Sequence, residues 1–193
     1  LNGAFLGLYL NVENMDEAFL TSQGLDPNGN LYKATYDGAC LSVQDNVNTH
    51  WEKKTNESSG REDLQELIQK INTVPDSAYY QFAHEVLDYD RMVNIIALNL
   101  LLANGSTYYH NYYMYHNPGD GKWSMFPWDM DKTFTSYGTG YPFQRSTSWE
   151  ADNPFLERAM MCAPIFEDIQ QRLKELTQTF FSPDYLYPII DSI

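Results

Sequence analysis

The sequence predicts one α+β domain, on three observations. Short apolar runs bounded by turn residues indicate strands near the start and in the middle of the chain, and two groups of amphipathic stretches indicate helices. At 193 residues with 43% hydrophobic content, the chain can bury one sizeable core. No run approaches eighteen uninterrupted apolar residues, which excludes a membrane-spanning helix. The net charge of −14, without clustered Lys and Arg, argues against nucleic acid as a partner.

The first segment predicts a strand followed by a short helix. Phe5–Val12 is a dense apolar run that Glu13 ends, and Asp16 is placed to cap a helix that continues through Leu20. The chain opens at Leu1 without an initiator Met and enters a strand directly. We therefore expect a fragment from which upstream residues are missing.

Turn residues fill the next stretch. Asp26–Asn30 predicts a turn that leads into a strand over Leu31–Tyr36, which would form one arm of a hairpin. The alternating Asp and Asn also resemble the opening of a calcium loop, but Leu31 stands where that loop requires Gly, so a plain turn is favoured. The polar residues of Asp45–Arg61 predict a loop that serves as a lid or is simply solvated.

In the middle of the chain, apolar residues recur at the spacing of α-helices. Ser59–Asn72 predicts a helix whose apolar residues share one face, namely Leu64, Leu67, Ile68 and Ile71. A second helical region begins at Pro75 and Asp76 and has an inner face of Phe82, Val86 and Leu87. A longer buried helix then extends from Arg91 to about Ala103.

A hairpin and two helices complete the prediction. Asn111–His116 and Lys122–Phe126 alternate aromatic and polar residues around the turn Asn117–Gly121. Thr135–Ser148 is rich in Gly, Ser and Thr and predicts a loop. Two terminal helices follow, over Pro154–Met161 and Pro164–Phe180.

Cysteine and histidine give no sign of a metal or disulfide framework. Cys40 and Cys162 are far apart in sequence and lack metal-ligand spacing, so buried free thiols are favoured over a disulfide. The four histidines form no pattern typical of zinc, and we expect no zinc site.

The most informative feature is an amide and a carboxylate placed after two different elements. Asn111 follows the predicted long helix, and Asp129 follows the predicted hairpin, with Asp131 two residues further. Enzymes that transfer phosphate hold a nucleotide's divalent metal between such groups. Two other interpretations stay open: Asp129 and Asp131 lie in a surface turn, and Asn111 hydrogen-bonds to the backbone where a strand starts.

Several motifs in this order resemble the CotH family of spore-coat-type atypical protein kinases. The resemblance rests on Asn2-Gly3 through Glu13, Leu31-Tyr32-Lys33-Ala34, Trp51-Glu52-Lys53-Lys54, Asn111-Tyr112-Tyr113-Met114-Tyr115 and Pro127-Trp128-Asp129-Met130-Asp131. It covers nearly all of residues 1–193. The resemblance implies a single domain with an atypical protein-kinase-like fold, mainly the helical larger lobe with a linker strand and β-hairpins, truncated on its amino-terminal side.

The resemblance also implies a bound ATP with Mg²⁺ or Mn²⁺. Asp129 would hold the ion that bridges the phosphates, Asn111 would ligate a second ion, and Asp131 would ligate or orient it. Hard oxygen ligands of this kind suit these two cations.

Three further residues take nucleotide-binding roles from the same resemblance. Glu13 would face the adenine edge from the linker, although a strand-ending Glu in solvent fits the sequence nearly as well. Lys33 and Lys54 would contact phosphates, whereas each lysine taken alone is more often solvated or paired with an acidic neighbour.

Ser106 bears on whether the chain is an active enzyme. In the family the corresponding residue is normally an Asp that accepts the proton of the substrate hydroxyl, and a Ser hydroxyl is too weak a base for this task. Loss of a general base costs about 10²- to 10⁴-fold in rate.

Three functions therefore remain as hypotheses. The first is an ATP-dependent Ser/Thr protein kinase that acts on coat or cell-surface proteins, in an extracellular or spore-surface location. The second is a pseudokinase-like scaffold or assembly module of such a complex. The third is a carbohydrate-associated module, because Tyr and Trp residues stack on sugars, although aromatic residues in these numbers more often fill a core.

Overall fold

A computed structural model describes residues 12–35, 38–104, 107–108, 110–134 and 153–192. Within these residues it contains seven α-helices and a four-stranded sheet, which confirms the predicted α+β class. The helices are α1 (Glu17–Ser22), α2 (Glu62–Thr73), α3 (Tyr79–Val86), α4 (Tyr89–Leu101), α5 (Pro154–Met161), α6 (Ala163–Gln178) and α7 (Pro183–Ile190). The strands are β1 (Asn30–Ala34), β2 (Trp51–Lys53), β3 (Tyr112–His116) and β4 (Trp123–Pro127), and two 3₁₀ turns lie at Asp76–Ala78 and Met130–Lys132.

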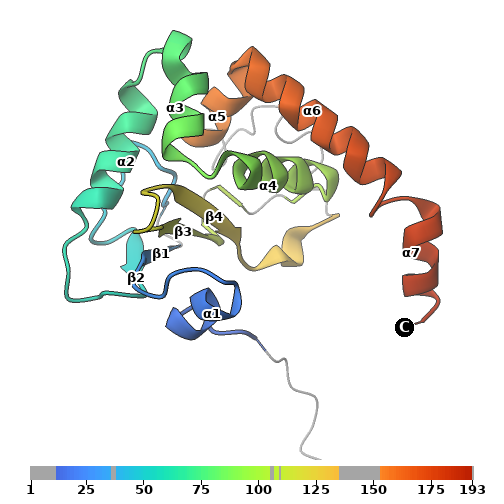
Figure 1. The fold of residues 1–193 in the computed structure, drawn as a ribbon, viewed down its shortest axis with the longest axis horizontal. Helices are drawn as coiled ribbons and strands as arrows, with labels where there is room; N and C mark the ends of the chain where they lie inside the picture. Colours follow the sequence, from blue (N-terminus) through green and yellow to red (C-terminus); the bar gives the residue numbers. More distant parts are fainter. Residues whose placement is uncertain (1–11, 36–37, 105–106, 109, 135–152, 193) are drawn as a thin grey trace, which may run out of the picture.

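The four strands form one antiparallel sheet in the order β2-β1-β3-β4 (Figure 1). The predicted hairpin after the long helix is confirmed as β3 and β4, with Met114 opposite Met125. The prediction of a simple loop over Asp45–Arg61 is wrong, because β2 lies inside this range and pairs with β1. Trp51 and Lys53 are buried and flank an exposed Glu52, so the stretch has the alternation of a half-buried strand.

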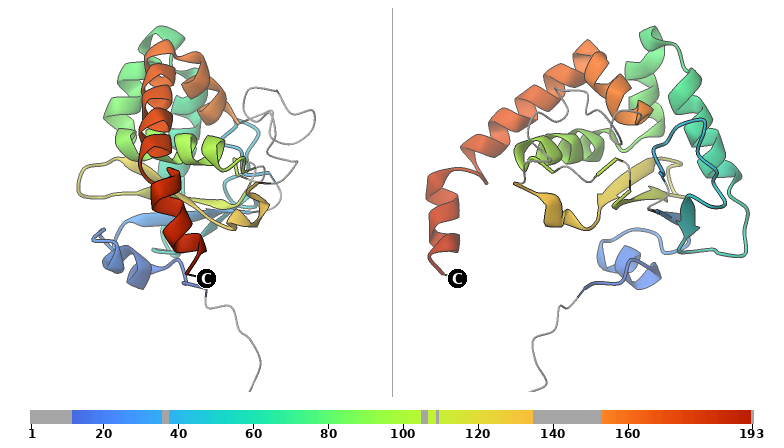
Figure 2. Two further views of the ribbon diagram at one scale, coloured as in Figure 1. Left: turned by 90° about the vertical axis from the view of Figure 1, so that its right-hand side faces the viewer. Right: turned by 180° about the vertical axis from the view of Figure 1, so that it is seen from behind.

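The sheet divides the domain into two layers of unequal depth. Helices α2 to α6 cover one face and α1 covers part of the other, which the edge-on view shows clearly (Figure 2). The deeper layer is the main core, to which the sheet contributes Tyr32, Trp51, Tyr112, Met114, Trp123 and Met125. The shallower layer holds Leu31, Tyr113, Tyr115 and Phe126 against Phe19 and Leu20 of α1. Alternate residues of each strand thus supply opposite faces.

Most helix predictions hold, with small shifts at their ends. All four apolar residues predicted for the inner face of α2 are buried, and Asp16 caps α1 as expected through bonds from the main-chain N–H groups of Ala18 and Phe19. Helix α4 begins at Tyr89 rather than Arg91 because Asp88, its N-cap, accepts a hydrogen bond from the Arg91 N–H at 3.3 Å.

Helix α7 was not predicted. It contains Pro188 in its interior, a residue that argues against a helix when the sequence is read alone, and it contributes no buried side chain. Tyr187 and Ile190 are exposed on it, and the helix projects from the end of α6 away from the sheet (Figure 1).

Two other predictions meet the structure only in part. Cys40 and Cys162 are thiols, as expected, but both are half-buried rather than fully buried. The predicted strand Phe5–Val12 lies outside the described residues except for Val12, and the loop Thr135–Ser148 lies outside them entirely. In the part of the chain that the structure describes, no helix is long and apolar enough to cross a membrane.

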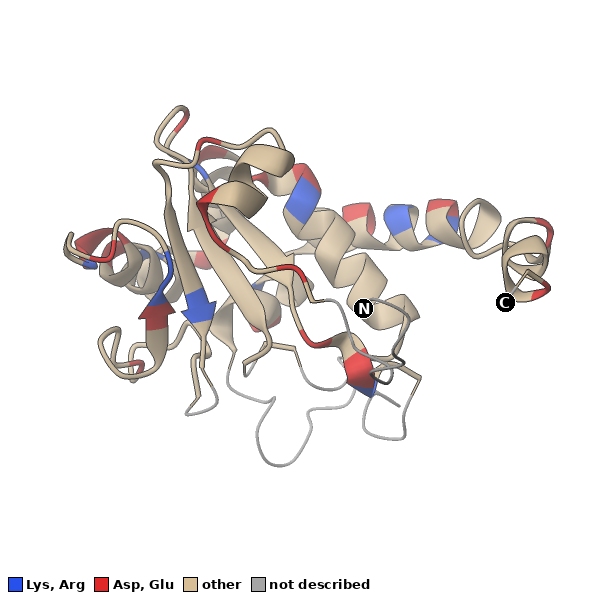
Figure 3. Cartoon of the chain, turned by 90° about the horizontal axis from the view of Figure 1, so that it is seen from below, with Lys and Arg blue, Asp and Glu red and all other residues tan. Residues whose placement is uncertain are grey.

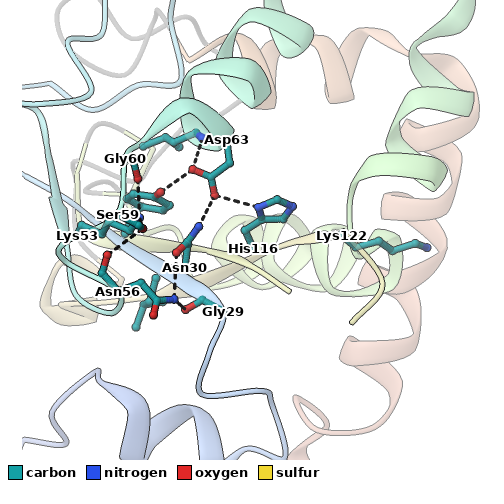
Figure 4. A network of polar contacts seen from close by, with 12 residues as sticks. Gly29, Asn30, Lys53, Asn56, Ser59, Gly60, Asp63, His116 and Lys122 are labelled. Atoms are coloured by element: carbon teal, nitrogen blue, oxygen red, sulfur yellow. Dashed lines mark hydrogen bonds and ion pairs between the residues drawn. The ribbon is translucent and has the colours of Figure 1, made fainter. Parts of the chain in front are cut away.

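A half-buried carboxylate joins the first turn of α2 to the sheet (Figure 4). Asp63 accepts hydrogen bonds from Tyr32 Oη at 2.6 Å and from Asn30 Nδ2 at 2.8 Å, and its Oδ2 lies 2.9 Å from His116 Nδ1. The main-chain N–H of Leu64 adds a fourth bond. Burial alone would raise the pKa of Asp63, but the hydrogen bonds outweigh it and hold the pKa below its ordinary value.

We expect Asp63→Asn to lower the free energy of unfolding by about 2–3 kcal/mol, because an amide turns one acceptor oxygen into a donor that faces other donors. Since the folded-state pKa is depressed, the carboxylate stabilises the protein above its unfolded pKa, and this contribution is lost as the pH falls toward the folded value. Urea unfolding from pH 7 to pH 3 measures both effects.

The exposed neighbour Glu62 provides the control. Glu62→Gln should leave stability within about 0.5 kcal/mol of the parent protein. Equal losses for the two variants, or an unchanged pH dependence in Asp63→Asn, would show that the network does not carry this stability.

Candidate functional site

Two connecting segments lie side by side at one end of the sheet. We call residues 102–111, between α4 and β3, the helix-exit loop, and residues 128–134, after β4, the strand-exit segment. Three hydrogen bonds join them: Trp128 N to Asn111 O at 3.0 Å, Phe134 N to Leu102 O at 2.8 Å, and Asn104 Nδ2 to Met130 Sδ at 3.2 Å. The structure therefore brings together the two segments that the sequence marked as metal-binding.

The backbone of both segments is strained. Among the described residues seven non-glycine residues have a positive φ, and five of them belong to these segments: Ala103, Tyr108, Asn111, Asp129 and Phe134. Asn111 has φ 63° and Asp129 has φ 53°. Left-handed conformations cost free energy in residues other than Gly, and they gather at functional sites where the surrounding structure enforces them.

Buried side chains enforce the shape of the helix-exit loop. Asn104 is buried, and its Nδ2 lies 2.8 Å from Asn99 Oδ1 and 2.6 Å from Thr107 Oγ1, in addition to its contact with Met130. Asn99 Nδ2 in turn donates to Tyr108 Oη at 3.2 Å. The amide nitrogen of Asn104 thus has three partners from the end of α4, the helix-exit loop and the strand-exit segment, so a displacement of the loop would weaken hydrogen bonds of buried polar groups.

Sequence reasoning missed this network, although a signal for it existed. Asn99 interrupts the most apolar run of the chain, and a polar residue on a buried helix face must find a partner.

Electrostatics also link the two segments. Burial lowers the pKa of His110 below its ordinary value, and the carboxylate of Asp129 opposes this effect. The Asp129 charge is thus close enough to act on a ring in the helix-exit loop. His110 is half-buried, so water screens this interaction only in part.

The three predicted metal ligands differ in exposure. Asn111 is half-buried, whereas Asp129 and Asp131 are exposed and Asp131 lies 3.9 Å from Lys132 Nζ. The main-chain hydrogen bond from Trp128 N to Asn111 O joins Asn111 to the residue that directly precedes Asp129. Amide and carboxylate oxygens suit Mg²⁺ or Mn²⁺, which keep several water ligands and need few from the protein. No group of three or more His, Cys, Asp or Glu side chains placed to hold a metal exists in the described ranges.

Lys33 is the predicted phosphate-binding residue that lies beside this site. Its Nζ is 5.4 Å from the centre of the ring of Trp128, and Trp128 is the residue before Asp129. In the sheet it stands opposite Tyr113 on one side and Glu52 on the other. The basic parts of β1 and β2 lie side by side in the view from below (Figure 3).

Among the described residues, no contact brings the remaining predicted site residues to this site. Lys54 forms an ion pair with Glu52 at 3.0 Å, the acidic-neighbour pairing that the sequence left open. Glu13 is exposed ahead of α1, and Ser106 lies outside the described residues.

Comparison with known proteins identifies the family of this chain. The family model described as CotH kinase protein matches residues 1–193. The chain belongs to this family. It is similar to the inner spore coat protein H of Bacillus subtilis (strain 168), with 26% identity over 202 residues. The match covers 98% of this chain but 55% of that relative, so the chain spans about half of its length.

We expect Asn104→Ala to loosen both segments of this CotH-family site, because it removes the amide that joins them. Unfolding free energy should fall by about 1–3 kcal/mol, and amide hydrogen exchange should accelerate in residues 102–111 and 128–134 more than in α2. Mass spectrometry of exchanged peptides measures this difference.

Asn117→Ala in the exposed β3–β4 turn is the matched control. It should speed exchange in the turn alone. If Asn104→Ala accelerates exchange evenly over the whole domain, the network does not act locally.

Proposed function

We propose that this chain is the kinase-like, nucleotide-binding part of a CotH protein, which transfers phosphate from ATP to Ser or Thr of coat or cell-surface proteins. The observation that carries the proposal is the union of the helix-exit loop with the strand-exit segment, which brings Asn111 and Asp129 to either side of one hydrogen bond. The order of helix, loop, hairpin and acidic segment is the layout of the kinase catalytic region.

The chain's own residues have definable tasks in this proposal. Asn111 and Asp129 would hold the divalent ion, with Asp131 as a third oxygen donor or an orienting group, and Lys33 would approach the phosphates. The bound ion would neutralise charge on the phosphates during transfer. The contacts between the two segments hold Asn111 and Asp129 in the left-handed conformation, so both donors would be positioned before the nucleotide arrives, which lowers the cost of organising the site.

A second function has a specific observation in its favour. Ser106 stands where the family normally has a proton-accepting Asp, so a binding or scaffolding role without efficient transfer fits the sequence as well. Such a module would keep nucleotide affinity, because that affinity depends on the metal donors and not on the base.

Location and partners follow from the relative alone. The B. subtilis protein is named an inner spore coat protein. We propose a spore-surface or extracellular location and coat proteins as partners, on this likeness and on family membership.

The first prediction concerns nucleotide binding. Isothermal calorimetry should detect saturable binding of ATP with Mg²⁺ or Mn²⁺, and Asp129→Asn should weaken it by about tenfold or more through loss of a charged ligand. Asn, like Asp, tolerates the left-handed backbone at this position, so the variant removes charge without adding strain.

Asp184→Asn on α7, an exposed residue far from the site in sequence, is the control and should bind as the parent does. Absence of binding by a folded parent protein would remove both the kinase and the pseudokinase proposals.

The second prediction separates enzyme from scaffold. Transfer of radiolabelled phosphate should be slow in the parent, and Ser106→Asp should raise the rate by about 10²- to 10⁴-fold, since it supplies the missing base. An unchanged rate with intact ATP binding would favour the scaffold and show that the base is not the limiting defect.

A further inference from the structure

A groove lies between helix α4 and strand β4, and Pro127, which directly precedes the strand-exit segment, lines one end of it. It has a volume of about 420 Å³ and is lined by Asp88, Asp90, Arg91, Asn94, Ile95, Leu98, Met125, Phe126 and Pro127. The residues from α4 recur at spacings of three and four, so they form one stripe along the helix. Ile95, Leu98 and Met125 make the floor apolar, and the volume lies within the range of about 300–1,000 Å³ typical of binding sites.

One wall of the groove is the outer edge of the sheet. Among the described strands β4 is terminal, and its outer side carries an isolated parallel bridge between Trp123 and Leu87 at the start of the strand. Trp123 O points outward, since it accepts a bond from Asp88 N at 2.8 Å, and the outward direction recurs at every second residue. The N–H and C=O of Met125 therefore face the groove, where no described segment pairs with them. Beyond the bridge at Trp123, Met125 offers a donor and an acceptor and Pro127, which has no N–H, offers an acceptor alone. Such groups on a strand edge can pair with another extended chain.

The charge of the groove favours a basic partner. Asp88 and Arg91 form an ion pair at 3.0 Å, and the Arg91 guanidinium lies 5.0 Å from the centre of the Phe126 ring, so these two charges offset one another. Asp90 is exposed at the end of the groove, and the structure shows no ion pair for it within the described residues. The whole chain carries a net charge of −14, which adds long-range attraction for a cationic segment.

We propose that this groove binds an extended segment of a partner protein, which adds to β4 as a further strand and places a Lys or Arg at Asp90 and an aliphatic side chain over Ile95 and Leu98. The interaction needs neither ATP nor a catalytic base, so it is independent of the function proposed above.

The geometry fixes the spacing of the two partner side chains. Asp90 and Leu98 are eight residues apart in one helix, a rise of about 12 Å. An extended peptide spans this distance with about four residues, and an even number keeps both side chains on the same face. The recognised pattern is thus a basic residue and an aliphatic residue separated by about four positions.

A direct test uses a fluorescein-labelled peptide of about nine residues, in which alternating Thr and Val carry one Arg and, four positions later, one Leu. Fluorescence anisotropy with the nucleotide-free protein should show saturable binding. Asp90→Lys should weaken it by about five- to tenfold, through loss of an ion pair and gain of a repulsion. The same variant should bind a peptide with Glu in place of Arg more tightly than the parent does.

N-methylation of the peptide tests strand addition itself. Methyl groups on the peptide nitrogens that face β4 should abolish binding, whereas methyl groups on the alternate nitrogens should not. Asp184→Lys on α7 is the charge-matched control and should bind as the parent does.

Four results would overturn the proposal. The first is that the folded parent shows no saturable binding of the peptide, and the second is that Asp90→Lys and Asp184→Lys weaken binding equally. The third is that methylated peptides bind alike wherever the methyl groups stand. The fourth is that the protein associates with itself through β4 and that the peptide reverses this association. The last result, seen by sedimentation, would assign the edge to a second copy of this chain.

Discussion

The hydrogen bond between the main chains of Trp128 and Asn111 is the contact on which the candidate site depends. It continues the β3–β4 ladder beyond the last paired residues and holds two left-handed residues in place, one on each side. The Phe134–Leu102 and Asn104–Met130 bonds then keep the strand-exit segment beside the helix-exit loop. A hairpin with strongly paired aromatic strands thus acts as the rigid base from which two irregular segments are positioned.

The sheet serves two purposes because its faces differ. The face toward α2–α6 is filled by large apolar side chains and anchors the domain, whereas the other face is covered by α1 over only part of its area. Lys33, Glu52 and Trp128 belong to this second face or its margin, where charged side chains remain accessible. The main core and these charged side chains therefore lie on opposite faces of one sheet.

The sequence predicted the elements far better than their pairing. Periodicity located α2, α4 and the β3–β4 hairpin, since an apolar stripe or a turn between alternating residues is a local signal. Strand β2 was missed because Lys53 is a charged residue, which predicts a solvent-exposed position. In the fold Lys53 is buried, and its ammonium group donates to Gly60 O at 2.6 Å. At the site, residue types indicated Asn111 and Asp129. Their strain and the network of Asn104 depend on contacts between segments, which no local pattern reveals.

The left-handed backbone at Asn111 and Asp129 has an evolutionary consequence. At such positions Gly, Asn and Asp are the residues that fit without a large penalty, whatever the chemistry demands. Selection for shape and selection for metal ligation then favour the same few amino acids. A chain of this shape that binds no cation would therefore still tend to retain this amide and this carboxylate, so the two residues alone do not distinguish an enzyme from a scaffold.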